Sequence, residues 1–262
     1  MGKFKDENGN VLETSKAVAL GLVKGNTNVT INNGTIYHNI YGGGAYGSVG
    51  TFTYDNIGEN PTGMPTACAE HTGSATVTIL GGTIGTTGNN NGMIYGSSRG
   101  DVDAPGSIQD KLAWVHDTHV IIGGANANPQ IKGSVYGSGE NGHTFDDAEV
   151  FVHSGTIGIL EGTPVGNDEE TPDNNSEDAT YTGVAFPYRG NVYGGGCGTD
   201  LYYTNPTGVA NPYDGKGDAY NPLGGIVYGN ASVTIDGGQV AHNVYGAGSM
   251  GSVGMLDASR SF

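Results

Sequence analysis

Cysteine is scarce in this sequence: only Cys68 and Cys197 occur among 262 residues. Their wide separation does not match the spacing of metal ligands, and it leaves one disulfide and two free thiols as alternatives. Basic residues are also few, 10 against 26 acidic ones, which gives a net charge of −16. Because such a surface repels phosphate backbones and anionic headgroups, binding to nucleic acids and to lipid surfaces is disfavoured.

Long apolar runs are missing as well. No stretch approaches the ~18 apolar residues of a membrane-spanning helix, so we expect no membrane insertion. Residues 1–7 begin with basic side chains but lead into no apolar segment of the kind that a signal peptide has. The four residues after the first glycine run, residues 47–50, return as residues 251–254. We therefore expect a fragment, without its signal peptide, of a longer extracellular or cell-surface protein.

Glycine is the abundant residue, with 49 in the chain, far above the ~7% that is average for globular proteins. The glycines do not recur at every third position, which excludes collagen. They mark an internal repeat instead, in which an aliphatic residue, a tyrosine and a glycine follow one another. The five copies are Ile40-Tyr41-Gly42, Ile94-Tyr95-Gly96, Val135-Tyr136-Gly137, Val192-Tyr193-Gly194 and Val244-Tyr245-Gly246.

A triplet rich in β-branched residues precedes each copy, with a small-residue turn behind it. Three short strands joined by glycine turns, about 22 residues in all, are typical of one coil of a parallel β-solenoid. Since side chains alternate along a strand, the first and third residues of each triplet point inward. This inner ladder consists of Val29, Ile31, Val77, Ile79, Val120, Ile122, Val150, Val152, Val233 and Ile235.

Two further aliphatic ladders follow from the same alternation. The second contains Ile36, Ile84, Ile157 and Val240, and the third contains Ile40, Ile94, Val135, Val192 and Val244. The repeat tyrosines then point outward as a stacked aromatic row, flanked by asparagines; the alternative is a corner that buries the tyrosines at one edge. As candidate ligand-binding residues we take Tyr41, Tyr95, Tyr136, Tyr193, Tyr245, Asn39, Asn191 and Asn243.

The combined pattern, seen in Val77-Thr78-Ile79, Gly81-Gly82-Thr83-Ile84 and Asn191-Val192-Tyr193, resembles the glycine-rich repeats of large bacterial surface and adhesin-like proteins. The resemblance extends over residues 28–254 between the insertions. It implies an all-β, pectin-lyase-like fold, a right-handed parallel β-helix of about five coils with long loop insertions. It says less about function, because some relatives of that fold cleave polysaccharides and many are adhesins or passenger domains.

The rest of the chain lies outside the repeat. Residues 1–27 form an N-terminal segment that could cap the stack, either as a helix over residues 13–24 or as an extra strand. Residues 28–254 form the repeat domain and residues 255–262 a tail. Long insertions leave the repeat and are either a binding surface or neutral decoration; they span residues 51–74, 99–117, 161–189 and 198–229.

Catalytic and metal-binding patterns are weak. His116 and His119 are the only close histidine pair, and positions three apart on a strand point to opposite faces, which spoils a zinc site. The calcium-binding nonapeptide of acidic repeats is absent, and we expect no metal or cofactor. The strand cores carry almost no charge, so an active site would depend on loop aspartates. These are Asp101, Asp103, Asp110, Asp117, Asp200, Asp214 and Asp218.

These observations favour a non-catalytic structural or adhesive domain whose loops and tyrosine row contact a glycan or a host-surface protein. The alternative is a polysaccharide lyase or glycoside hydrolase built on the same scaffold. A third expectation is end-to-end self-association, because uncapped coils leave strand edges free. The loop tripeptide Arg99-Gly100-Asp101 matches an integrin-attachment sequence, but a match of three residues is frequent by chance.

Overall fold

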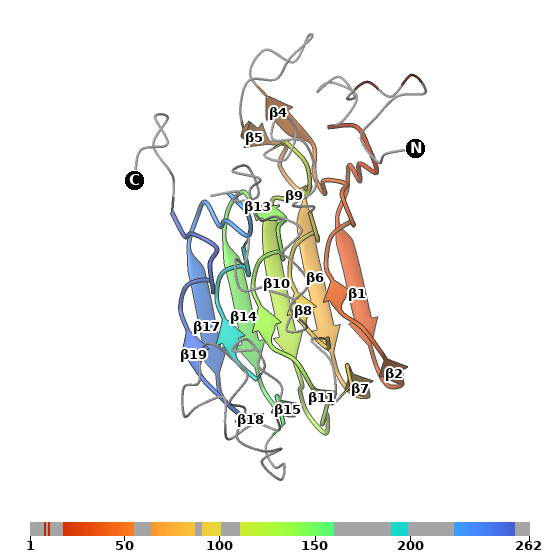
Figure 1. Ribbon diagram of the computed structural model, residues 1–262, viewed down its shortest axis with the longest axis vertical. Helices are drawn as coiled ribbons and strands as arrows, with labels where there is room; N and C mark the ends of the chain where they lie inside the picture. Colours follow the sequence, from red (N-terminus) through yellow and green to blue (C-terminus); the bar gives the residue numbers. More distant parts are fainter. Residues whose placement is uncertain are drawn as a thin grey trace, which may run out of the picture.

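The computed structural model describes an all-β chain, and the described residues contain no helix. Three parallel sheets of five strands each contain most of the strands (Figure 1). Each of the five repeat units, numbered here in chain order, gives one strand to each sheet, and within a sheet the units follow one another in sequence order. The described residues are 8, 10, 18–54, 64–86, 91–100, 111–159, 190–198 and 223–254.

The first sheet is formed by the β-branched triplets and the residues just before them. All its neighbouring strands are parallel, and the register aligns each triplet with the next. Its strands are β1 (Thr27–Ile31), β6 (Ser74–Ile79), β10 (Asp117–Ile122), β14 (Ala148–Val152) and β17 (Ala231–Ile235).

The second and third sheets consist of two-residue strands, which three residues connect in units 1, 3 and 5 and longer segments connect in units 2 and 4. The second contains β2 (Thr35–Ile36), β7 (Thr83–Ile84), β11 (Gln130–Ile131), β15 (Thr156–Ile157) and β18 (Gln239–Val240). The third contains β3 (Ile40–Tyr41), β8 (Ile94–Tyr95), β12 (Val135–Tyr136), β16 (Val192–Tyr193) and β19 (Val244–Tyr245). The sequence therefore placed all fifteen strands of the repeat in the correct order.

The aliphatic ladders meet in one core, as the alternation predicted. The inward residues of units 2, 3 and 4 are fully buried there, and the register stacks each of them on its equivalent. The second ladder has a fifth member, Ile131 of unit 3, which follows a longer turn than its equivalents and was not included in the predicted ladder. At about 1.5–3 kcal/mol for each fully buried aliphatic side chain, these ladders are the main source of stability.

A fourth column of single paired residues, missed by the sequence analysis, runs beside the three sheets. It is extended in units 3 and 4 by β9 (Trp114–Val115) and β13 (His143–Thr144). Against it lie Trp114 and the antiparallel pair β4 (Phe52–Tyr54) and β5 (Pro65–Cys68). The column consists of Val23, Val49, Val115, Thr144, Val227 and Val253 in parallel pairing.

The glycine after each repeat tyrosine is required by the neighbouring unit. A Cβ added at Gly42, Gly96, Gly137 or Gly194 would collide with the backbone oxygen of the equivalent glycine in the next unit. At Gly246, in the last unit, an added Cβ would meet nothing within 4 Å. Close backbone approach, and not a turn with positive φ, therefore explains this glycine.

Some sequence expectations differ from the structure or lie outside the described residues. The predicted N-terminal helix is absent from its described part, residues 18–24, where a turn leads to the bridge between Val23 and Val49. Both cysteines are free thiols, which excludes the disulfide. The insertion 161–189 and the tail 255–262 fall outside the described residues. Among the described residues, no helix is long and apolar enough to cross a membrane.

Candidate functional site

The repeat tyrosines form a continuous aromatic stack, as the sequence predicted. Neighbouring ring centroids lie 4.7–5.0 Å apart, and the ring planes are within 17° of parallel. The expectation that the row faces solvent is wrong for its centre: Tyr95, Tyr136 and Tyr193 are 4%, 0% and 4% exposed. Alternation correctly put the rings opposite the aliphatic ladder, but it does not reveal what packs on that side, where Met93 and Cys197 join the cluster.

Only the two end tyrosines keep appreciable surface. Tyr245 is 42% exposed, and Tyr41 is half-buried. The Tyr41 hydroxyl donates a hydrogen bond of 2.5 Å to the carboxylate of Glu140, which also lies 3.7 Å from Arg99. Burial and then the Glu140 charge raise the pKa of Tyr41 well above its usual value, so this hydroxyl stays protonated. The predicted ligand-binding role of the row remains a prediction, and it is confined to these two ends.

The candidate asparagines hold the stack together. In units 1 to 4 the residue before the third-sheet strand accepts a hydrogen bond, through its side chain, from the backbone N–H of the equivalent residue one unit later. The acceptors are an amide oxygen in Asn39 and Asn191, a thioether in Met93 and a hydroxyl in Ser134. The distance from the side-chain acceptor to the backbone nitrogen is 3.1 Å for Asn39 to Met93 and for Met93 to Ser134. It is 3.0 Å for Ser134 to Asn191 and 2.9 Å for Asn191 to Asn243.

We call this series the acceptor ladder. It gives Asn39 and Asn191 a structural task that the sequence analysis did not foresee. Asn191 is completely buried, and its oxygen also lies 2.9 Å from Nδ1 of His242. With both contacts made, this oxygen has no lone pair left to direct at a ligand.

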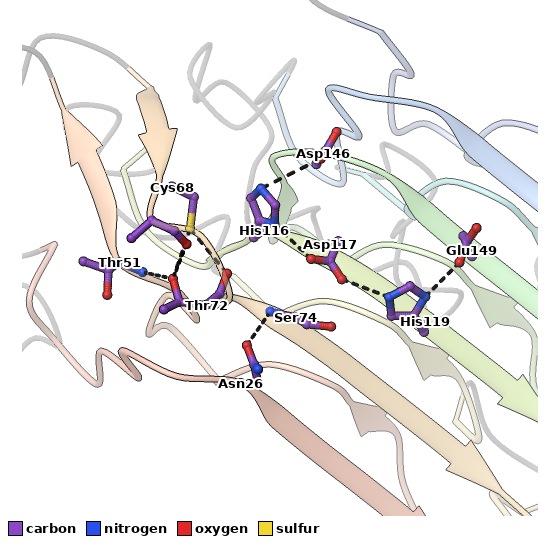
Figure 2. Close-up of polar contacts among 11 residues, drawn as sticks. Asn26, Thr51, Cys68, Thr72, Ser74, His116, Asp117, His119, Asp146 and Glu149 are labelled. Carbon is purple, nitrogen blue, oxygen red and sulfur yellow. Dashed lines mark hydrogen bonds and ion pairs between the residues drawn. The ribbon is translucent and has the colours of Figure 1, made fainter.

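A second cluster lies on the outer face of the first sheet, between β10 and β14 (Figure 2). Nδ1 of His119 lies 2.9 Å from Glu149, and its Nε2 lies 2.9 Å from Asp117. Asp117 also contacts Nδ1 of His116 at 2.9 Å, and the other ring nitrogen of His116 is 3.8 Å from Asp146. We call these five residues the histidine–carboxylate network.

The network corrects the prediction that His116 and His119 point to opposite faces. His116 precedes β10, so strand alternation does not apply to it, and the carboxylate of Asp117 contacts both rings. The sequence held a signal for one partner: aligning the triplets of units 3 and 4 pairs His119 with Glu149. Asp146, which lies before β14, could not be found by that alignment.

The charges of the network are fixed by its hydrogen bonds. The bond from His119 is the main cause that holds the pKa of Asp117 well below its usual range. The same bond raises the pKa of His119, against the opposing effect of burial, and Glu149 adds to the rise. Because ionised carboxylates only accept hydrogen bonds, the two that flank the His119 ring favour its protonated form.

The thiol of Cys68, near this network, is not activated as a nucleophile. Cys68 donates from its thiol to the carbonyl of Thr72 at 3.6 Å, and burial raises the pKa of the thiol (Figure 2). Reactive cysteines have a lowered pKa, so this environment is that of an inert thiol.

Most of the remaining candidate site residues lie outside the part of the chain that the structure describes. Of the loop aspartates named above, only Asp117 lies in the described part of the chain. Within the residues that the structure describes, no group of three or more His, Cys, Asp or Glu side chains is arranged to hold a metal ion.

The outer face of the first sheet also carries an aromatic residue. Phe151 lies between Ile121 and Thr234 in the register and stacks on His153, with ring centroids 6.2 Å apart. His153 in turn contacts Asp236 at 2.8 Å. This face therefore presents one partly exposed ring beside carboxylates and imidazoles.

Comparison with protein-family models, with curated proteins and with solved structures finds no match to this chain.

Proposed function

We propose that this chain is a non-catalytic scaffold, a right-handed parallel β-helix of five coils whose walls are the three sheets and the fourth column. The observation that carries the proposal is that the repeated residues have structural roles. Its aliphatic residues fill the core, its tyrosines stack, its glycines allow close approach and its asparagines accept backbone hydrogen bonds. These four kinds of repeated residue all contribute to stacking, as expected for a structural repeat.

We further propose that the scaffold is adhesive and binds a glycan on the outer face of the first sheet. Aromatic rings pack against the apolar faces of sugars, while carboxylates accept hydrogen bonds from sugar hydroxyls. Phe151 offers the ring, and Glu149 and Asp236 offer carboxylates whose side chains are 40% and 60% exposed. This placement replaces the centre of the tyrosine row, which is buried. The proposal includes a location outside the cell or on its surface.

The glycan proposal is tested by binding of the chain to a panel of acidic and neutral oligosaccharides. Phe151→Ala is expected to lose about tenfold or more in affinity, the factor that corresponds to 1.4 kcal/mol. Ala125→Ser, in an exposed turn between β10 and β11, is the control and is expected to bind normally. Binding by Phe151→Ala at the affinity of wild type would exclude this face.

The same incubations test the alternative of an enzyme. New reducing ends or unsaturated sugar products would replace the non-catalytic proposal with a polysaccharide hydrolase or lyase. Fractionation of the native cells with an antibody against this chain tests the proposed location.

A further inference from the structure

The stack ends in two faces whose strand edges have no neighbour among the described residues. At one end lie β1, β2 and β3, and at the other β17, β18 and β19. The last unit exposes large apolar side chains: Ile235 is 41%, Val244 49% and Tyr245 42% exposed. Free strand edges with apolar side chains are the surfaces on which further strands add.

The two end faces are congruent. In unit 1 and unit 5 the three strands are separated by turns of equal length, and aliphatic residues occupy the same inward positions, followed by the same tyrosine. The inner units do not share this path, because each carries extra residues between its strands. The matched pairs are Val29 with Val233, Ile31 with Ile235, Ile36 with Val240, Ile40 with Val244, and Tyr41 with Tyr245.

The two end faces also carry few of the charged residues of the chain. Although the net charge is −16, residues 23–41 contain one charged side chain, Lys24, and residues 227–245 contain one, Asp236, with the histidines neutral. No like charges would therefore meet if one face were placed on the other. Repulsion between two copies arises from the rest of the chain, and salt screens it.

We infer that a second copy of this chain stacks head to tail on the first, with its unit 1 paired in parallel to unit 5. Each ladder then continues across the junction. Asn243 occupies the last position of the acceptor ladder, and its side-chain oxygen would accept the backbone N–H of Asn39 of the second copy. Gly246 would meet the oxygen of the second copy's Gly42, as Gly194 meets that of Gly246. This contact joins two different faces, so it repeats without closing and gives an open filament.

The junction has one local cost, in the fourth column. Residues 21–24 of the second copy and residues 251–254 of the first would occupy the same level, so one of these segments must move aside. A single bridge with two backbone hydrogen bonds holds each segment. Val23 bonds to Ser48 and Gly50 at 2.9 and 2.7 Å, and Val227 bonds to Ser252 and Gly254 at 3.0 and 2.8 Å. Association is therefore expected to be slower than simple docking, because it follows a local opening.

Two variants block the two faces separately. Gly246→Ala adds a methyl group that meets nothing within the monomer but would collide with a stacked copy. Thr30→Pro acts on the other face. The carbonyl of Ile31 accepts from the N–H of Leu80, the residue directly after β6, so the N–H of Thr30 faces the free edge. Proline at position 30 removes this N–H without breaking an existing ladder bond. Ala125→Ser, in an exposed turn between β10 and β11, is the control.

The test is sedimentation velocity of the full chain at rising concentration and at low and physiological salt, with circular dichroism to verify folding. Wild type and Ala125→Ser are expected to form a series of oligomers that salt strengthens. Gly246→Ala and Thr30→Pro are each expected to remain monomeric alone. Mixed together, they are expected to give one-to-one dimers, because each retains the face that the other lacks.

The inference does not depend on glycan binding and stands or falls separately from it. Monomeric wild type at every concentration would overturn it. So would oligomers of wild type that either variant leaves unchanged, or an absence of dimers in the mixture of two folded variants. If Thr30→Pro does not fold, Asn28→Pro replaces it at the other outward position of the same edge.

Discussion

Units 3 and 5 show how far a neighbour decides the properties of a repeat. Val135 and Tyr136 of unit 3 are fully buried, whereas the equivalent Val244 and Tyr245 of unit 5 are 49% and 42% exposed. Gly137 cannot accept a Cβ, yet Gly246 has open space around it. The residue types are the same in both units. Burial and the need for glycine therefore arise from the unit stacked above, not from the local sequence.

The largest difference is expected between two identical glycine substitutions. Gly137→Ala would press a methyl group against the backbone of Gly194, which cannot rotate away as a side chain can, and should destabilise the fold by about 3 kcal/mol or more. Gly246→Ala should stay within about 0.5 kcal/mol of wild type. Denaturant titrations of dilute protein give both values. Equal losses would show that the glycine serves the turn itself.

A smaller difference is expected in the third aliphatic ladder. Val135→Ala removes two methyl groups from a fully buried site and should cost about 2 kcal/mol, while Val244→Ala at the exposed end should cost less than about half of that. Thermal unfolding followed by circular dichroism compares them. Equal melting temperatures of the two variants would mean that the last unit is covered in solution. Sedimentation of the same samples would then show whether a second copy of the chain covers it.

The acceptor ladder gives a third comparison. Asn191→Ala leaves the N–H of Asn243 without its acceptor next to a buried position, at a cost of about 1–3 kcal/mol. Asn243→Ala, at the last position of the ladder, should be close to neutral. Hydrogen exchange of the Asn243 amide is the direct measurement, and its protection should fall in Asn191→Ala. Unchanged protection would mean that the contact contributes nothing to stability.

The smallest effect concerns pH. The pKa of His119 is raised in the folded state, so its pairing contributes fully below the unfolded value of ~6.5 and is lost as pH rises through the folded pKa. Asp117 has the opposite sign: its lowered pKa contributes above ~3.9 and is lost as pH falls. Stability should therefore decline modestly on the alkaline side of pH 6.5. His119→Gln should flatten that decline, and an unaltered profile would assign it to other groups.

The sequence predicted most of the architecture because alternation and repeat spacing are local properties. It identified the three strands of each unit and the inward residues of the first ladder, for example Val120 and Ile122. It missed the fourth column because a single paired residue such as Val49 leaves no periodic pattern. The burial of Tyr136 was not visible either, because alternation gives the side of a sheet and not what covers it.

The candidate site was less predictable than the fold. The network around His119 depends on contacts across units, and only the register pairs His119 with Glu149. The acceptor ladder was hidden for a chemical reason. An amide, a thioether and a hydroxyl perform the same task in Asn39, Met93 and Ser134, so no single residue type marks the position.

The acceptor ladder gives the stack a direction. Each side chain accepts only from the unit that follows it in the sequence, so a unit that joins after an existing one finds an acceptor already in place. A unit that joins before it must bring its own acceptor into position. During synthesis, when the N-terminal units leave the ribosome first, each new unit is therefore templated by the one before it. We expect the units to fold in sequence order, beginning with the N-terminal unit.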